Sequence, residues 1–204
     1  MARIQSVDYE AMPVQANEMR GYGKQLNGEM TKVYSSVAEM HNSWYGKRYN
    51  ELVKAFNNMI PQINDMLTLV VTDVPFALET IANNYAQADR GSNVTVANNE
   101  PHNKITNISI SHDVGMKFIT GNVLDARKNI STNFSNARDL MNKIESVYMK
   151  INWQSEAAEA FKAKFTKLKN NMVAQFENIN TEFTKLMQQT EQDIANTEKA
   201  NNVN

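Results

Sequence analysis

Apolar residues recur every three or four positions through most of this chain, and this rhythm limits its fold more than any other feature. After Trp44 the intervals between them are 4, 3, 4, 4, 3 and 4 residues. The positions are Leu52, Phe56, Met59, Ile63, Leu67, Val70 and Val74. This spacing is close to one helical turn, so the apolar side chains share one face of a helix. The sequence therefore predicts an all-α protein.

The same pattern returns 109 residues later in the chain. The two tryptophans, Trp44 and Trp153, are separated by this interval, and a small residue, Gly46 or Ser155, follows each of them two positions on. After Trp153 the register is kept without a gap, at Phe161, Phe165, Leu168, Met172, Phe176, Ile179 and Phe183. A second apolar stripe precedes each tryptophan, although these two stripes do not superpose at the same interval. We interpret the chain as two copies of a helix, a short break and a second helix.

Local chemistry predicts how the breaks are made. Gly46 supplies the backbone freedom that a sharp reversal needs, whereas Ser155 is expected to cap the following helix through its hydroxyl. Pro61 and Pro75 fall inside the second helix of the first half and are expected to kink or break it. Asp73 is then predicted to be the N-cap of a restarted helix.

The segment between the two halves does not continue the helical pattern. It contains Gly91, Pro101 and five asparagines, and short stretches alternate between polar and apolar residues. We therefore divide the chain into a first helical hairpin, an extended linker and a second helical hairpin. Their predicted ranges are residues 1–90, 91–111 and 112–204.

Composition and motifs exclude several classes of function. The 21 basic and 22 acidic residues give a net charge of −1, which argues against nucleic-acid binding and against a polybasic membrane anchor. The chain has no cysteine, and His41, His102 and His112 lack the spacing of metal ligands. The first residues lack the apolar run of a signal peptide, and no apolar stretch is long enough to span a bilayer. We expect no catalytic site, no cofactor and no metal, and hence no enzyme.

Two motifs carry a resemblance to a known family. Trp44-Tyr45-Gly46 lies at the predicted turn of a helical hairpin, and a Tyr-x-x-x-Asp motif, Tyr85 to Asp89, lies near its end. This combination resembles the WXG family, the small helical proteins exported by ESX, or type VII, secretion systems. The second half departs from the pattern, because Ser155 replaces the glycine and Ile194 replaces the tyrosine.

The resemblance implies a fold and a function. Family members pair as antiparallel hairpins in a four-helix bundle, and the turn of one hairpin and the tail motif of the other form one export signal. This chain is similar to such a pair fused into one elongated bundle, in which Tyr85 and Asp89 are expected beside Trp153 and Ser155. The linker from Asp89 to His112 reaches about 75–80 Å when extended, which exceeds helices of about 50–60 Å. The implied protein is non-enzymatic, is secreted without a cleavable signal peptide, and has the type VII machinery as its partner.

Other interpretations stay open at this point. The two hairpins could be exchanged between two chains in a swapped dimer, and a co-secreted helical protein or toxin could be a further partner. The protein could instead be a cytosolic adaptor that pairs with a larger type VII toxin, or a membrane-active effector that exposes its apolar stripes. Trp44 and Trp153 would also suit hydrophobic plugs at the ends of a bundle, and Tyr85 continues an apolar stripe.

Overall fold

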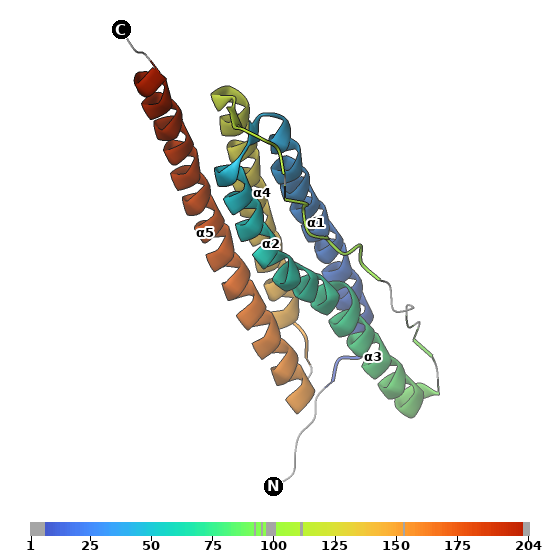
Figure 1. The fold of residues 1–204 in the computed structure, drawn as a ribbon. Helices are drawn as coiled ribbons and strands as arrows, with labels where there is room; N and C mark the ends of the chain where they lie inside the picture. Colours follow the sequence, from blue (N-terminus) through green and yellow to red (C-terminus); the bar gives the residue numbers. More distant parts are fainter. Residues whose placement is uncertain are drawn as a thin grey trace.

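The first half of the chain reverses its direction at Trp44. The computed structural model describes residues 7–91, 93, 94, 96, 101–110, 112–152 and 154–201. Helix α1 (Met12–Glu39) is followed by a 3₁₀ turn, η1 (Met40–Asn42), and by the short strand β1 (Trp44–Tyr45). Helix α2 (Lys47–Leu67) starts directly after Gly46 and returns beside α1 (Figure 1). Gly46 has a φ of 118°, a region that residues with a side chain rarely adopt, so the reversal requires glycine.

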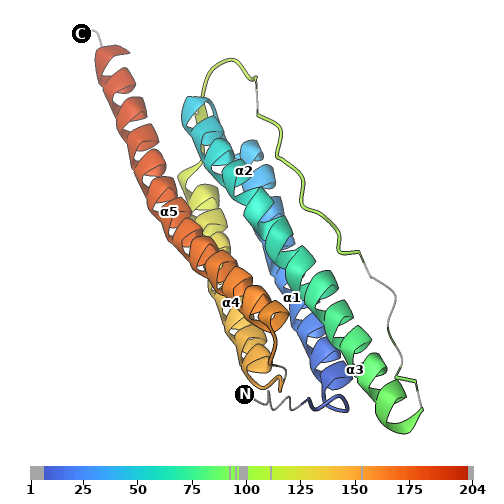
Figure 2. The same cartoon turned by 90° about the horizontal axis from the view of Figure 1, so that it is seen from below.

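The second helix of this half is not broken at its prolines. Helix α2 continues through Pro61, and a π-helical turn, η2 (Thr68–Asp73), joins it to α3 (Val74–Arg90) in a nearly continuous rod (Figure 2). Pro75 has no N–H, and in an α-helix its ring would collide with the carbonyl four residues earlier; the wider π turn relieves this conflict. The predicted N-cap at Asp73 is wrong, because its backbone is helical and its side chain makes no capping hydrogen bond.

After α3 the chain returns to the Trp44 end of the molecule. The described part of the connecting segment contains no helix and runs along the first hairpin in both ribbon views (Figures 1 and 2). It leads into strand β2 (Lys117–Phe118), which pairs antiparallel with β1. Trp44 faces Phe118 and Tyr45 faces Lys117 in this pair. The connection therefore spans the bundle, as its length allows.

The second half forms another helical hairpin. Helix α4 (Thr120–Met149) descends from the Trp44 end, and helix α5 (Glu156–Asn201) runs back. The Ser155 hydroxyl accepts a hydrogen bond of 3.1 Å from the N–H of Ala158, so the predicted cap of α5 is confirmed. Glu156 and Glu159 lie in the first turn, at the positive end of the helix dipole. Trp153 lies outside the described residues.

Helices α1 and α4 pack along each other in opposite directions. At one end, the Gln15 side chain donates to the carbonyl of Lys150 at 3.3 Å. At the other end, Asn122 donates to the Ser43 hydroxyl at 2.9 Å. Because the start of α1 meets the end of α4, the two helices are antiparallel.

Helices α2 and α5 form the second antiparallel pair between the hairpins. Arg48, at the start of α2, lies 3.6 Å from Asp193 near the end of α5. Lys164, near the start of α5, lies 4.0 Å from Asp73 in the π turn. The chain is thus an all-α, elongated bundle in which two antiparallel hairpins pack together, and the predicted fold class is confirmed.

Both hairpins contribute to one continuous core. The seven stripe positions from Leu52 to Val74 are each at most 1% exposed. In the second half five of the seven positions are buried, and Phe161 and Leu168 pack against the edge of the core. Phe134 of α4 stacks on Phe176 of α5 with their ring centroids 4.3 Å apart. Since each hairpin supplies only part of this core, the two halves depend on each other for burial.

A salt bridge lies inside the contact between α1 and α3. Arg20 donates to both carboxylate oxygens of Glu79, one of these bonds being 2.8 Å long, and the two residues are 5% and 2% exposed. One turn later, a Cβ on Gly23 would lie 2.7 Å from a methyl group of Val71, so the glycine permits close packing against the π turn. These two features fix how α1 sits against η2 and α3.

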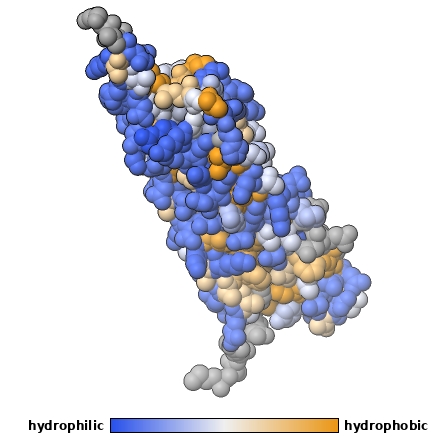
Figure 3. Space-filling model, viewed as in Figure 1, coloured by the Kyte–Doolittle hydropathy of each residue, from blue (hydrophilic) through white to orange (hydrophobic). Residues whose placement is uncertain are grey.

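The surface is largely hydrophilic on the face shown in Figure 3, and apolar side chains gather in two areas towards the ends of the bundle. Among the helices of the described ranges, none has the length and apolar character needed to cross a membrane.

Candidate functional site at the Trp44 turn

Trp44 is buried at the point where the two hairpins meet, with 1% of its surface exposed. Its indole stacks on Phe183 of α5, with ring centroids 5.7 Å apart and planes 20° from parallel. Phe118 of β2 meets the indole edge-on at 5.6 Å, and Tyr49 of α2 lies 6.2 Å away. Trp44 therefore closes the end of the bundle and also holds the second hairpin against the first.

The part of the chain that connects α3 to α4, here called the return segment, passes over this turn just before β2. A Cβ on Gly46 would lie 3.3 Å from the carbonyl oxygen of Gly115 and 3.4 Å from the Cβ of Met116. The N–H of Ile119 donates to the carbonyl of Ser43 at 2.8 Å, which extends the pairing of β1 with β2. A glycine thus suits position 46 for two reasons: the turn needs a positive φ there, and the neighbouring backbone leaves little room for a Cβ.

One buried and one exposed polar contact hold the turn to the segments beside it. The Tyr49 hydroxyl donates to the carbonyl of Val37 at 3.1 Å, and burial raises the pKa of Tyr49 to about 12. His41 Nε2 lies 3.0 Å from a carboxylate oxygen of Asp113 in the return segment. The turn is therefore fixed to α1 and to the approach of β2.

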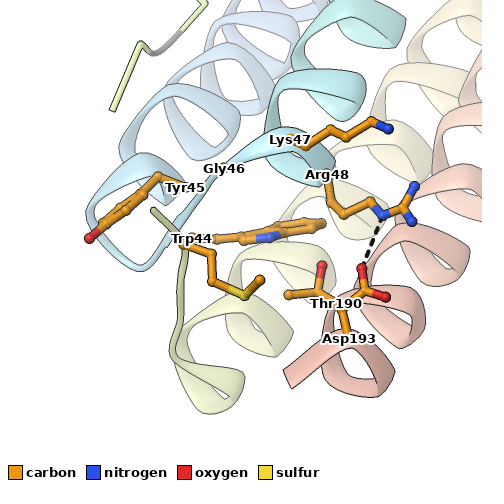
Figure 4. Close-up of a pocket in the computed structure, with 8 residues that line it drawn as sticks. Trp44, Tyr45, Gly46, Lys47, Arg48, Thr190 and Asp193 are labelled. Atoms are coloured by element: carbon orange, nitrogen blue, oxygen red, sulfur yellow. Dashed lines mark ion pairs between the residues drawn. The ribbon is translucent and has the colours of Figure 1, made fainter. Parts of the chain in front are cut away.

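A pocket of about 340 Å³ opens between this turn and α5 (Figure 4). Trp44 and Met116 supply apolar walls, while Arg48 reaches across to Asp193. Tyr45 points away from α5, to the opposite side of the turn. Asp193 directly precedes Ile194, the position that corresponds to Tyr85 in the repeat. The turn of the first half thus lies beside the tail of the second half.

The complete end motif lies at the other end of the first hairpin, on the last turns of α3. Tyr85 is 39% exposed, whereas Asp89 accepts a hydrogen bond from the hydroxyl of Tyr9, just before α1. This hydrogen bond is the main reason that the pKa of Tyr9 is raised. Arg90 lies 2.6 Å from Glu10 and close to the ring of Tyr9. Asp89 is therefore engaged with the start of the chain, while the ring of Tyr85 faces solvent in part.

One protein-family model matches the part of the chain that contains both motifs. Residues 5–90 match the WXG100 family, described as proteins of 100 residues with WXG. The first hairpin is similar to WXG100 proteins, and the match covers less than half of the chain. WXG100 proteins are small, non-enzymatic helical proteins of type VII secretion, and they often work in pairs. No curated protein and no solved structure gives a significant match to the chain.

Within the first hairpin, the structure places the two motifs at opposite ends. Trp44 and Gly46 lie beside the tail of α5, and Tyr85 and Asp89 lie beside the start of α1. The expected contact of the end motif with the second turn stays a prediction, because Trp153 lies outside the described residues. Over the described ranges, no group of three or more His, Asp or Glu side chains could hold a metal ion.

The sequence reasoning missed one set of residues that contact the return segment. Asn57 and Asn64 of α2 each form two hydrogen bonds with the backbone of this segment. Their spacing of seven residues, continued backwards by Asn50, was a visible signal for one helix face lined with amides. The partner backbone could not be read from the sequence, because it lies more than forty residues away.

Proposed function

We propose that this protein is a non-enzymatic substrate of a type VII secretion system, exported as two hairpins fused in one chain and acting through protein–protein contacts. The observation that carries the proposal is the position of α4 and α5 on the first hairpin, which resembles WXG100 proteins. They pack antiparallel on α1 and α2 and complete one core with them. In paired family members a separate partner takes this place; here the same chain supplies it.

The proposed organisation is a duplication, with hairpins at residues 1–90 and 112–204 and a linker at 91–111. The apolar register shared at an interval of 109 residues supports it. The antiparallel arrangement adds further support, because it puts the tail of the second half beside Trp44. The second hairpin keeps the packing role of a family member, although it carries only part of the motif residues.

We assign the export signal to Tyr85 and Asp89 on α3, in combination with the turns. Tyr85 is the member of the motif whose ring is accessible, so we infer that the secretion machinery contacts it directly. Trp44 and Gly46 act on the signal by keeping the bundle closed, since Trp44 is buried and Gly46 lies under the return segment. Trp153 and Ser155 are assigned the corresponding structural role at the second turn.

The test compares two substitutions on α3 in the native host. Tyr85→Ala should leave the protein in the cell lysate, whereas the wild-type protein should be found in the culture medium at its full, unprocessed mass. Phe76→Ala is a matched control, because Phe76 lies on the same helix and is 40% exposed. An immunoblot of lysate and medium measures the distribution.

Two results would contradict the proposal. Equal export of wild type and Tyr85→Ala would remove Tyr85 from the signal. Retention of the wild-type protein in the lysate would argue against export altogether and would favour an intracellular role.

A further inference from the structure

A stretch of the return segment, residues 101–110, is held along the first hairpin; we call it the strap. At Asn57 the side-chain amide donates to the carbonyl of Ile108 and accepts from the N–H of Ile108, both at 2.9 Å. Asn64 makes the same pair of bonds with the backbone of Ile105, at 2.9 and 3.0 Å. Each asparagine therefore pairs with one residue of the strap as a neighbouring β-strand would.

The spacing of the two asparagines matches an extended chain. The step of seven helical positions from Asn57 to Asn64 rises by about 10.5 Å, and the step of three extended positions from Ile105 to Ile108 covers about 10 Å. The two helix positions and the two strap positions therefore stay in register. Asn27 on α1 donates to the carbonyl of Asn103 at 3.2 Å, so amides from both helices contact the strap backbone.

Side chains of the strap fill apolar space below it. Ile105 and Ile108 are 8% and 7% exposed and belong to the core cluster, whereas Thr106 and Asn107 between them are exposed. A hollow of about 410 Å³ continues past Ile108 and is lined by Tyr34 of α1 and Tyr49 of α2, among others. The surface between α1 and α2 thus forms a groove that accepts aliphatic side chains at positions i and i+3 of an extended segment. The two residues between them are left in solvent.

We propose that the groove between α1 and α2 is a peptide-binding site, and that the strap is its tethered occupant. The ligand is an extended segment of a partner protein with aliphatic residues at positions i and i+3. The four hydrogen bonds from Asn57 and Asn64 reach only main-chain atoms, so they place few demands on the ligand's sequence. The aliphatic pair supplies the selectivity, through burial of the two side chains.

The strap and the partner segment compete for this site. A tethered segment acts as if present at roughly millimolar concentration. The groove of the intact protein therefore opens only to a partner that is abundant or that makes further contacts. This proposal concerns the groove alone and does not depend on export.

The first experiment frees the groove in the full-length protein. The double substitution Ile105→Asp and Ile108→Asp removes the aliphatic anchors of the strap. A fluorescent peptide of residues 101–110 should then bind at least about tenfold more tightly than to the wild-type protein, whose own strap competes. A peptide with aspartate at both isoleucine positions should not bind.

Asparagine substitutions in the same background test the hydrogen bonds. Asn57→Ala should weaken peptide binding by at least about tenfold, since it removes two hydrogen bonds at once. Asn58→Ala is the matched control, because Asn58 is the next residue on the helix and is exposed. Fluorescence anisotropy gives the affinities, and circular dichroism verifies that each variant is helical. A helical variant that binds no better than wild type, or equal effects of the two alanine substitutions, would overturn the proposal.

A second experiment uses the wild-type protein and needs no freed groove. Backbone amide exchange should show protection at Ile105 and Ile108, and Asn57→Ala should reduce the protection at Ile108. Excess unlabelled peptide of residues 101–110 should accelerate exchange at both amides of the labelled protein, because it displaces the strap. If the amides of Ile105 and Ile108 are unprotected in the wild-type protein, or if saturating peptide does not change their exchange rates, the strap is not a displaceable occupant of the groove.

Discussion

Gly46 lies at the turn, directly after β1, where the backbone of Gly115 and Met116 passes close by. Its φ of 118° and the carbonyl of Gly115, which a Cβ would approach to 3.3 Å, both act against a side chain. The need for backbone freedom at this position could be predicted from the sequence, as could the cap at Ser155, because both depend on local chemistry. The chain that crosses above Gly46 could not be predicted, since it comes from a distant segment.

Replacing this glycine should destabilise the fold by a measurable amount. Gly46→Ala is expected to lower the free energy of unfolding by roughly 1–3 kcal/mol, the cost of holding a residue with a Cβ in a backbone region that is essentially restricted to glycine. Gly21→Ala is the matched control, because Gly21 lies inside α1 and a Cβ there would meet nothing within 4 Å. It should raise the free energy of unfolding by about 0.5–1 kcal/mol. Urea denaturation of both variants gives the comparison, and a Gly46→Ala protein as stable as wild type would contradict it.

At the scale of elements, the contact between α1 and α3 depends on the buried pair of Arg20 and Glu79. These residues are 59 positions apart, so no local sequence pattern predicts that they pair. The π turn between α2 and α3 was missed for a related reason. Pro75 predicts a conflict within a helix. Whether the helix ends there or widens into a π turn depends on the packing of η2 against Gly23.

Removing one member of the pair should lower the free energy of unfolding far more than replacing both members. Arg20→Met leaves the Glu79 carboxylate buried without its guanidinium, which should lower the free energy of unfolding by roughly 3–5 kcal/mol. The double variant Arg20→Met and Glu79→Leu should recover most of this loss, because no buried charge then stands alone. Chemical denaturation of the two single variants and the double variant completes the cycle. Additive effects of the two substitutions would show that the pair does not act as a unit.

At the scale of the whole molecule, the helical periodicity and the repeat predicted the all-α bundle, and the length of the linker allowed it to fold back along the helices. The route of the return segment could not be predicted from the sequence, because side-chain amides of α2 and the pairing with β1 determine it. The end motif shows the same limit. Asp89 bonds to Tyr9, a residue that no motif connected with it.

Cutting the connection should leave the bundle assembled. If residues 97–100 are replaced by a site for a specific protease, the two cleaved pieces should elute together at the mass of the intact protein. Their helical content should match that of the uncut chain, because the core is shared between the hairpins. Each piece made by itself should lose helicity by circular dichroism. Two hairpins that separate and stay fully helical would disprove this mutual dependence.

The covalent return segment also has a consequence for how the protein is made. Two separate chains that pair must be translated in matched amounts, and they come apart when they are diluted below their dissociation constant. In this protein one round of translation delivers both hairpins in a fixed one-to-one stoichiometry. A cell that holds only a few copies of the chain therefore holds every one of them already paired.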